Sequence, residues 1–225
     1  MEKEFYLKKY RPDITFISME EAKKELSKDW INILSESDAK VRTTKTLALW
    51  KREMAKELRN TILCLEDNLV DVELIKSSFG IAILYSIKFG NGEIGYYEGF
   101  IPKKENDYNI REWGKYPDSL KKFYTKLHNG FVDFICGTMG ISPDFKIECF
   151  NDYEWEVIED LNLNPEFSFD HSYIIFETGA GGNLLIDTTC EVYENSTVWF
   201  ANRAPSYNVN MWDILDEWII MGFGY

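Results

Sequence analysis

The hydrophobic pattern of this 225-residue chain changes its period near residue 79. Before that point, an apolar stripe with spacings of four, four and three residues predicts an amphipathic helix. Its members are Ala22, Leu26, Trp30 and Ile33. A second stripe predicts a helix over residues 44–65, with lysines and arginines on its opposite side. We therefore expect residues 1–78 to be helical and to precede a second region, residues 79–225, with a boundary between 79 and 110.

The second region has the pattern of an antiparallel sheet. Apolar runs at residues 81–85 and 94–97 flank Asn91-Gly92, a pair that suits a tight hairpin turn. Residues 173–177 and 183–187 flank a glycine-rich turn, and residues 197–201 resemble a further strand. Helical segments lie between and after these runs. We therefore expect a mixed sheet near the centre of residues 80–202, with the helix of residues 211–221 packed on it.

Three helices are predicted within this region. Residues 117–130 begin with a proline suited to a first turn, continue with a helical apolar face and end at Gly130. Asn151 and Glu154 resemble a capping box that opens a short helix reaching residue 161. Asn210 is expected to cap the final helix, whose apolar face includes Trp218. If Trp218 packs into the core, replacing it with Ala costs about 3–5 kcal/mol.

Charge is distributed unevenly along the chain. The net charge is −13, but residues 1–60 hold 14 basic and 11 acidic side chains. Residues 147–202 contain twelve carboxylates and neither Lys nor Arg. Such a field repels phosphate backbones and attracts basic proteins, so we expect a protein partner rather than nucleic acid. Acidic surfaces also aid solubility, which is the alternative reading of this stretch.

Motifs for catalysis or metal binding are weak. The Gly179-Ala180-Gly181-Gly182 run lacks the G-K-[ST] ending of a phosphate loop. The two histidines, His128 and His171, do not form a zinc-binding motif. Asp170, His171 and Ser172 are triad residue types, but neighbours in a strand point to opposite faces. We expect no catalytic residue, cofactor or metal, and we expect the four scattered cysteines to be reduced and mostly buried.

One segment is our candidate for partner binding. It combines four carboxylates with one tryptophan in the cation-free stretch, on or beside the helix expected after Asn151. These residues are Glu154, Trp155, Glu156, Glu159 and Asp160. Trp155 is either an apolar anchor for a partner or a core residue.

Three segments in order resemble the SUKH superfamily, the immunity-protein fold of bacterial polymorphic toxin systems. The first runs from Pro117-Asp118 to Asn129-Gly130. The second is the hairpin at residues 174–187, with its glycine-rich turn and final aspartate. The third is a strand at residues 198–200 followed by a helix at residues 212–218. The resemblance covers about residues 110–222. Where the family usually continues Asn-Gly into another glycine, this chain has Phe131-Val132.

The resemblance implies an α+β domain with helices on a curved, mainly antiparallel sheet. It also implies an antitoxin that neutralises a cognate toxin by binding, without a cofactor. A basic toxin, acting in the cytoplasm, fits the acidic stretch. The alternatives are a regulatory scaffold linked to cell-wall synthesis, as some relatives of the superfamily imply, and a hydrolase that uses surface carboxylates. No export signal or membrane span is recognised, so we expect a cytoplasmic protein without a membrane partner.

Overall fold

A computed structural model describes residues 3–155, 165–190 and 195–225. Within these residues, ten strands form two five-stranded antiparallel sheets, so the α+β class is confirmed. The first sheet consists of β1 (Thr15–Phe16), β2 (Leu69–Ser77), β3 (Gly80–Lys88), β4 (Ile94–Phe100) and β5 (Phe131–Asp133), paired in that order. The second consists of β10 (Arg203–Asn210), β9 (Asn195–Phe200), β8 (Gly182–Asp187), β7 (Ser172–Glu177) and β6 (Glu148–Cys149). The single sheet expected from the sequence is therefore divided in two.

Helices surround the first sheet and connect it to the second. The α-helices are α1 (Lys3–Lys8), α2 (Met19–Ala22), α3 (Lys28–Leu34), α4 (Ala39–Met54), α5 (Arg59–Asn68), α6 (Asp118–Lys122) and α8 (Met211–Gly222). Short helical turns are η1 (Glu105–Asp107), η2 (Trp113–Lys115), η3 (Phe123–Leu127), η4 (Asp144–Lys146), η5 (Phe150–Asp152) and η6 (Phe169–His171). Among the described residues, no helix is both long enough and apolar enough to cross a membrane.

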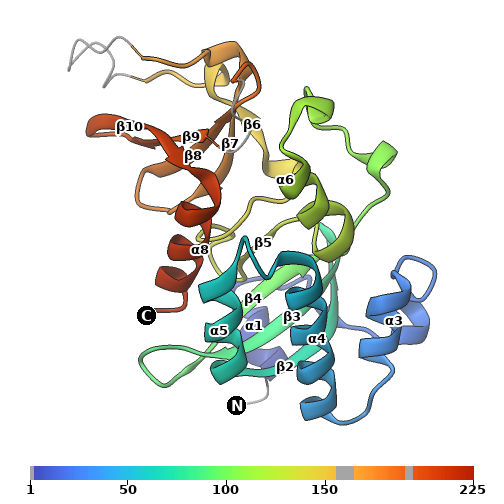
Figure 1. Ribbon diagram of the computed structural model, residues 1–225. Coiled ribbons are helices and arrows are strands. Elements are labelled where there is room, and N and C mark those ends of the chain that lie inside the picture. Colours follow the sequence, from blue (N-terminus) through green and yellow to red (C-terminus); the bar gives the residue numbers. More distant parts are fainter. Residues whose placement is uncertain (1–2, 156–164, 191–194) are drawn as a thin grey trace.

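Both faces of the first sheet are covered. In Figure 1, α4 and α5 lie in front of β2, β3 and β4, and α1 lies behind them. Ile83 and Tyr85 of β3 belong to the main core on the helix-rich side. Ala82 and Leu84 belong to a smaller core that also contains Leu7 of α1. Because successive side chains of a strand point to opposite faces, a strand buried on both sides is mostly apolar, as the buried part of β3 is apart from Ser86.

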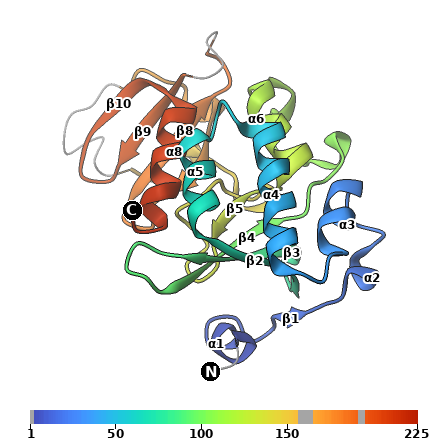
Figure 2. The ribbon, with the colours of Figure 1, turned by 60° about the horizontal axis from the view of Figure 1, so that its bottom comes forward.

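The two sheets are held together by one extended residue and by α8. Ile141 forms isolated bridges to both Phe131 of β5 and Phe176 of β7. Figure 2 shows α8 beside α5. The buried carboxylate of Asp216 on α8 accepts hydrogen bonds from the backbone N–H groups of Asn60 (2.8 Å) and Thr61 (2.7 Å), at the start of α5. It thereby caps a helix that has no side-chain cap of its own.

The N-terminal helices differ from the prediction in their boundaries. The first expected helix is divided into α2 and α3. Ser27 between them has an extended backbone, and its hydroxyl caps α3 by accepting from the N–H of Trp30. The second expected helix is also two, because residues 55–58 form turns between α4 and α5. The predicted apolar stripes are nevertheless buried. Residues 69–77, expected to be helical, form β2, so the first sheet takes strands from both sides of residue 79.

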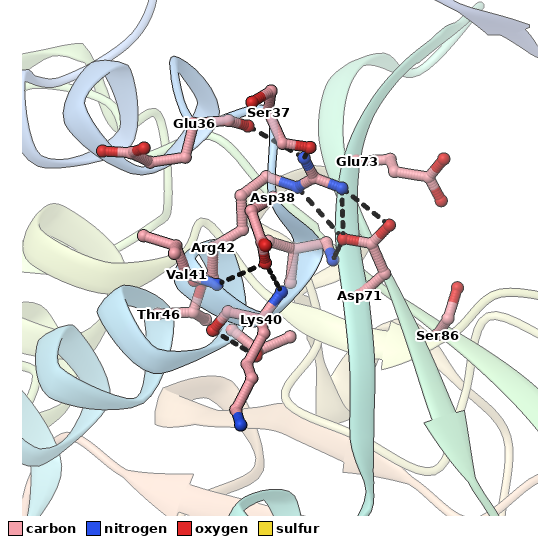
Figure 3. Close-up of polar contacts among 12 residues, drawn as sticks. Glu36, Ser37, Asp38, Lys40, Val41, Arg42, Thr46, Asp71, Glu73 and Ser86 are labelled. Atoms are coloured by element: carbon pink, nitrogen blue, oxygen red, sulfur yellow. Dashed lines mark hydrogen bonds and ion pairs between the residues drawn. The ribbon is translucent and has the colours of Figure 1, made fainter.

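An arginine fixes the helices to the edge of the first sheet (Figure 3). The guanidinium of Arg42 donates to the carboxylate of Asp71 on β2 at 2.7–3.0 Å and to the carbonyl oxygens of Glu36 (2.8 Å) and Ser37 (3.0 Å). Asp71 also accepts from the backbone N–H of Val72 at 2.8 Å. These contacts tie α4 and the turn before it to β2.

The predictions for the C-terminal half are mostly confirmed. The hairpins at β3–β4 and β7–β8 are present, and so is the Asn210 cap of α8. The helix after Pro117 continues from α6 into η3, a π-helical turn, and buries its predicted apolar face. The predicted capping box at Asn151 is wrong: Asn151 lies within η5, and its side chain donates to Asp170 at 2.8 Å. Residues 153–155 are not helical, and residues 156–161 lie outside the described residues.

Trp218 packs less deeply than expected. Its ring is half-buried against Phe176 and Phe200, at centroid distances of 5.3 and 6.2 Å. Trp212 is 4% exposed and donates from Nε1 to the Ser119 hydroxyl at 2.9 Å. We therefore predict that Trp218→Ala costs about 1.5–3 kcal/mol and Trp212→Ala about 3–5 kcal/mol. Urea unfolding of both variants measures the difference. An equal loss for the two would contradict this packing.

Candidate functional site

An acidic surface lies at the end of the second sheet that carries β6, η5 and η6. These three elements contact one another, in the upper part of Figure 1. Four side chains of the cation-free stretch are exposed there or close by in the chain: Glu148, Asp152, Glu154 and Asp170. Among the described residues, none of the four forms an ion pair with Lys or Arg. Their charges are therefore uncompensated by neighbouring cations and face solvent.

Of the five predicted partner-binding residues, the structure describes two. Glu154 is exposed, as a contact residue requires. Glu156, Glu159 and Asp160 lie outside the described residues. The acidic surface also includes Glu148 and Asp170, which the sequence reasoning did not select. The signal for them is that both fall within residues 147–202, the stretch without Lys or Arg.

The Trp155 ring packs against other aromatic rings of the protein. Its ring stacks on Phe150 with a centroid distance of 4.4 Å and an interplanar angle of 6°, and it contacts Trp199 edge-on at 5.6 Å. Its Nε1 donates to the carbonyl oxygen of Phe150 at 2.9 Å. With its face covered and its only donor satisfied, the half-buried ring packs against a small core of Phe150, Ile174, Leu185 and Trp199. Of the two readings of Trp155, these contacts favour the core residue.

A second polar centre surrounds Glu112, a residue that the sequence reasoning missed. Its carboxylate accepts from the Thr188 hydroxyl (2.6 Å), His171 Nδ1 (2.9 Å) and the Tyr173 hydroxyl (3.1 Å), and it pairs with Lys115. The Glu112 backbone is left-handed, with φ of 56°. This conformation is uncommon for a non-glycine residue and is maintained here by the surrounding contacts. No local pattern in the sequence predicts it.

The Glu112 centre is not a nucleophilic triad. Asp170 and Ser172 do not contact the His171 ring: Asp170 accepts from Asn151, and the buried Ser172 hydroxyl has no partner among the described residues. The three neighbours do not converge, but the strand argument for this was wrong: Asp170 and His171 lie in η6, and only Ser172 belongs to β7. Thr188 donates to the same carboxylate as His171, so its hydroxyl is not hydrogen-bonded to the imidazole ring. The arrangement ties η2 to the ends of β7 and β8.

We predict that Glu112 makes the fold acid-sensitive. Its pKa lies well below the ordinary 4.5, because the Lys115 ammonium, the Thr188 hydroxyl and His171 all stabilise the carboxylate. As pH falls below about 4.5, Glu112 becomes protonated in the unfolded chain but stays ionised in the folded chain, so the free energy of unfolding falls. Glu112→Gln should cost about 1–3 kcal/mol at pH 7 by urea unfolding and flatten this acid loss. The matched change at exposed Glu154, Glu154→Gln, should have no effect; equal losses would refute the role of Glu112.

The remaining chemistry-bearing residues are dispersed. In the described part of the chain, no three His, Cys, Asp or Glu side chains gather as a metal site. The cysteines are free, and only Cys149 is buried, which corrects the expectation of mostly buried thiols; Cys136 is exposed. No family model, curated protein or solved structure matches this chain.

Proposed function

We propose that this protein is an antitoxin: a cytoplasmic immunity protein that binds a basic toxin and neutralises it. The observation that carries the proposal is the acidic surface at β6, η5 and η6. It is built from a 56-residue stretch without a single Lys or Arg. Charge at such density speeds the approach of an oppositely charged protein by electrostatic steering. The ordered resemblance of residues 110–222 to SUKH immunity proteins supports the same function.

The first experiment identifies the partner and tests neutralisation. The chain is used to capture proteins from its native cells, and captured proteins are identified by mass spectrometry. Each captured protein is then expressed alone and together with this chain. The proposal expects a basic protein that arrests growth alone and is harmless in a stoichiometric complex. Capture of partners that are never toxic, in a multiprotein assembly, would replace the antitoxin with a regulatory scaffold.

The second experiment locates the interface. Glu148 and Glu154 are exposed, so reversing both to Lys changes the charge with little effect on the fold. The association rate with the toxin should fall at least tenfold at low salt, and the difference should shrink at 1 M salt, where the Debye length is about 3 Å. Reversal of Asp213 and Glu217, exposed on α8, is the matched control. Equal rates for all three proteins would place the interface elsewhere.

A further inference from the structure

Two phenylalanines stack on each other at the surface of the first sheet. Phe79 lies in the turn between β2 and β3, and Phe145 lies in η4. Their ring centroids are 5.6 Å apart and the rings are nearly parallel, at 7°. The residues are 52% and 47% exposed, so the pair is assembled outside the core. Contiguous exposed apolar surface of this kind marks binding sites more often than isolated apolar residues do.

The aromatic pair separates two hollows. The first has a volume of about 170 Å³ and is walled by Phe79, Phe134, Ile135 and Phe145. The second, of about 370 Å³, shares Phe79 and Phe145 and extends along Ile101. Ile135 is itself 43% exposed. The first hollow is below the roughly 300 Å³ of ordinary small-molecule pockets and is of a size for one large side chain.

The charge around the hollows is opposite to that of the whole protein. Their linings contain five cations and three carboxylates, against a net charge of −13 for the chain. The most buried carboxylate, Glu98, is neutralised by Arg11. Lys24, Lys104 and Lys146 form no ion pair within the described residues, and Lys146 donates only to a backbone carbonyl, at 3.0 Å. Lysines without carboxylate partners beside exposed rings suit an anionic ligand with an apolar group.

We propose that this surface is a docking site for an acidic peptide segment with one aromatic or branched aliphatic anchor. The anchor fills the first hollow against the Phe79–Phe145 pair. Aspartates or glutamates on either side of the anchor pair with the free lysines. Apolar anchors supply most of the binding energy at such sites, and rim charges supply orientation and rate. The site differs in place and in charge from the acidic surface, and it does not depend on toxin binding.

A peptide library tests the proposal without knowledge of the partner. Random 12-residue peptides displayed on phage are selected on the immobilised protein, and enriched peptides are synthesised with a fluorescent label. The expected consensus is one aromatic or aliphatic residue flanked by acidic residues. Phe79→Ser should weaken binding of the labelled peptide at least tenfold. The double change Lys24→Glu and Lys104→Glu should weaken it at least fivefold, with a smaller effect at high salt.

Matched controls separate the site from general surface effects. Phe5 on α1 is 61% exposed and lines neither hollow, so Phe5→Ser should leave peptide binding unchanged. Lys40 and Lys56 are exposed and without ion pairs, so their reversal to Glu controls for total charge. Bound peptide should also slow alkylation of Cys136, an exposed thiol in the lining of the first hollow.

Three results would overturn the proposal. The first is a basic consensus, or no enriched peptide at all. The second is enrichment that Phe79→Ser leaves intact. The third is tight binding of a labelled twelve-nucleotide oligothymidine that is weakened by the reversal of Lys24 and Lys104. Exposed aromatic rings beside lysines also bind single-stranded nucleic acid, and this result would assign the surface to that ligand. Each is measured on the folded full-length chain, and none requires a toxin.

Discussion

Arg11→Met is expected to lower the free energy of unfolding by about 3–5 kcal/mol. Arg11 donates through Nη1 to Glu98 at 2.8 Å and through Nη2 to the second carboxylate oxygen, and its guanidinium stacks on Phe134 at 4.1 Å. Glu98 is only 2% exposed. Met retains much of the apolar contact but leaves Glu98 buried without a counter-charge. Thermal or urea unfolding at pH 7 measures the loss.

The pH dependence of this variant identifies the cause. Burial already raises the pKa of Glu98 above 4.5 in the wild type, although Arg11 opposes the shift. Without Arg11 the pKa rises further, so the folded variant holds a proton that the unfolded chain releases. Its stability is then highest below the unfolded pKa and falls as pH rises through the folded pKa. The deficit relative to wild type should therefore shrink toward pH 5.

Two further proteins complete the test. Adding Glu98→Gln to Arg11→Met removes the unpaired charge and should restore a large part of the lost stability. Arg52 pairs with Asp29 at 2.7 Å where both side chains are about half exposed, so Arg52→Met should cost no more than about 1 kcal/mol. If the single and double variants at Arg11 and Glu98 are equally unstable, loss of packing rather than burial of charge is responsible.

Because of His128, the free energy of unfolding should fall by about 2 kcal/mol between pH 7 and pH 5. The ring is fully buried: Nδ1 donates to the carbonyl oxygen of Phe100 (3.3 Å), and Nε2 accepts from the Tyr85 hydroxyl (2.7 Å). That hydroxyl in turn accepts from Trp50 Nε1 at 2.9 Å. The carbonyl can only accept, so Nδ1 carries a proton. A second proton on Nε2 would deprive the Tyr85 hydroxyl hydrogen of its acceptor, so these bonds favour the neutral ring. Burial lowers the pKa of His128 from 6.5 to about 3.

The sign of the effect follows from proton uptake. Below pH 6.5 the unfolded chain protonates its histidine and the folded chain does not, so stability falls by about 1.4 kcal/mol per pH unit. His128→Phe keeps a ring among the surrounding aromatics and removes the titration. Its stability at pH 7 is lower, since the Tyr85 hydroxyl loses an acceptor. The informative quantity is the slope between pH 7 and pH 5; a slope in the variant equal to that of wild type would contradict a neutral buried His128.

Local patterns predicted the element types where a short segment carries its own signal. The Asn91-Gly92 turn, the Asn210 cap and the apolar face of residues 120–127 depend on contacts within four residues of one another. Such contacts depend only on the local backbone conformation, so the sequence patterns that produce them can be recognised without knowledge of the tertiary fold. The fold class follows from these elements.

The boundaries of the elements, and the pairing of segments far apart in the chain, could not be predicted in the same way. The strand β2 was missed although Val72 and Leu74 alternate with Asp71 and Glu73, a period-two signal of a strand. The alternation directly follows the apolar stripe of the preceding helix, and periodicity alone did not separate the two elements. Ser27 divides a continuous apolar stripe into two helices without disturbing its burial. Periodicity records which side chains are buried, and it does not record where the backbone turns.

The same distinction between local patterns and distant contacts applies to the candidate sites. The sequence determined the charge of the acidic stretch, because twelve carboxylates without a Lys or Arg give a negative charge however the stretch folds. Only the tertiary structure decided that Trp155 packs against Phe150, that Glu112 meets His171, and that Phe79 stacks on Phe145. In the last two cases the contacts join residues more than fifty positions apart. Their geometry depends on how the whole chain is routed between the two sheets, and no local pattern carries that information.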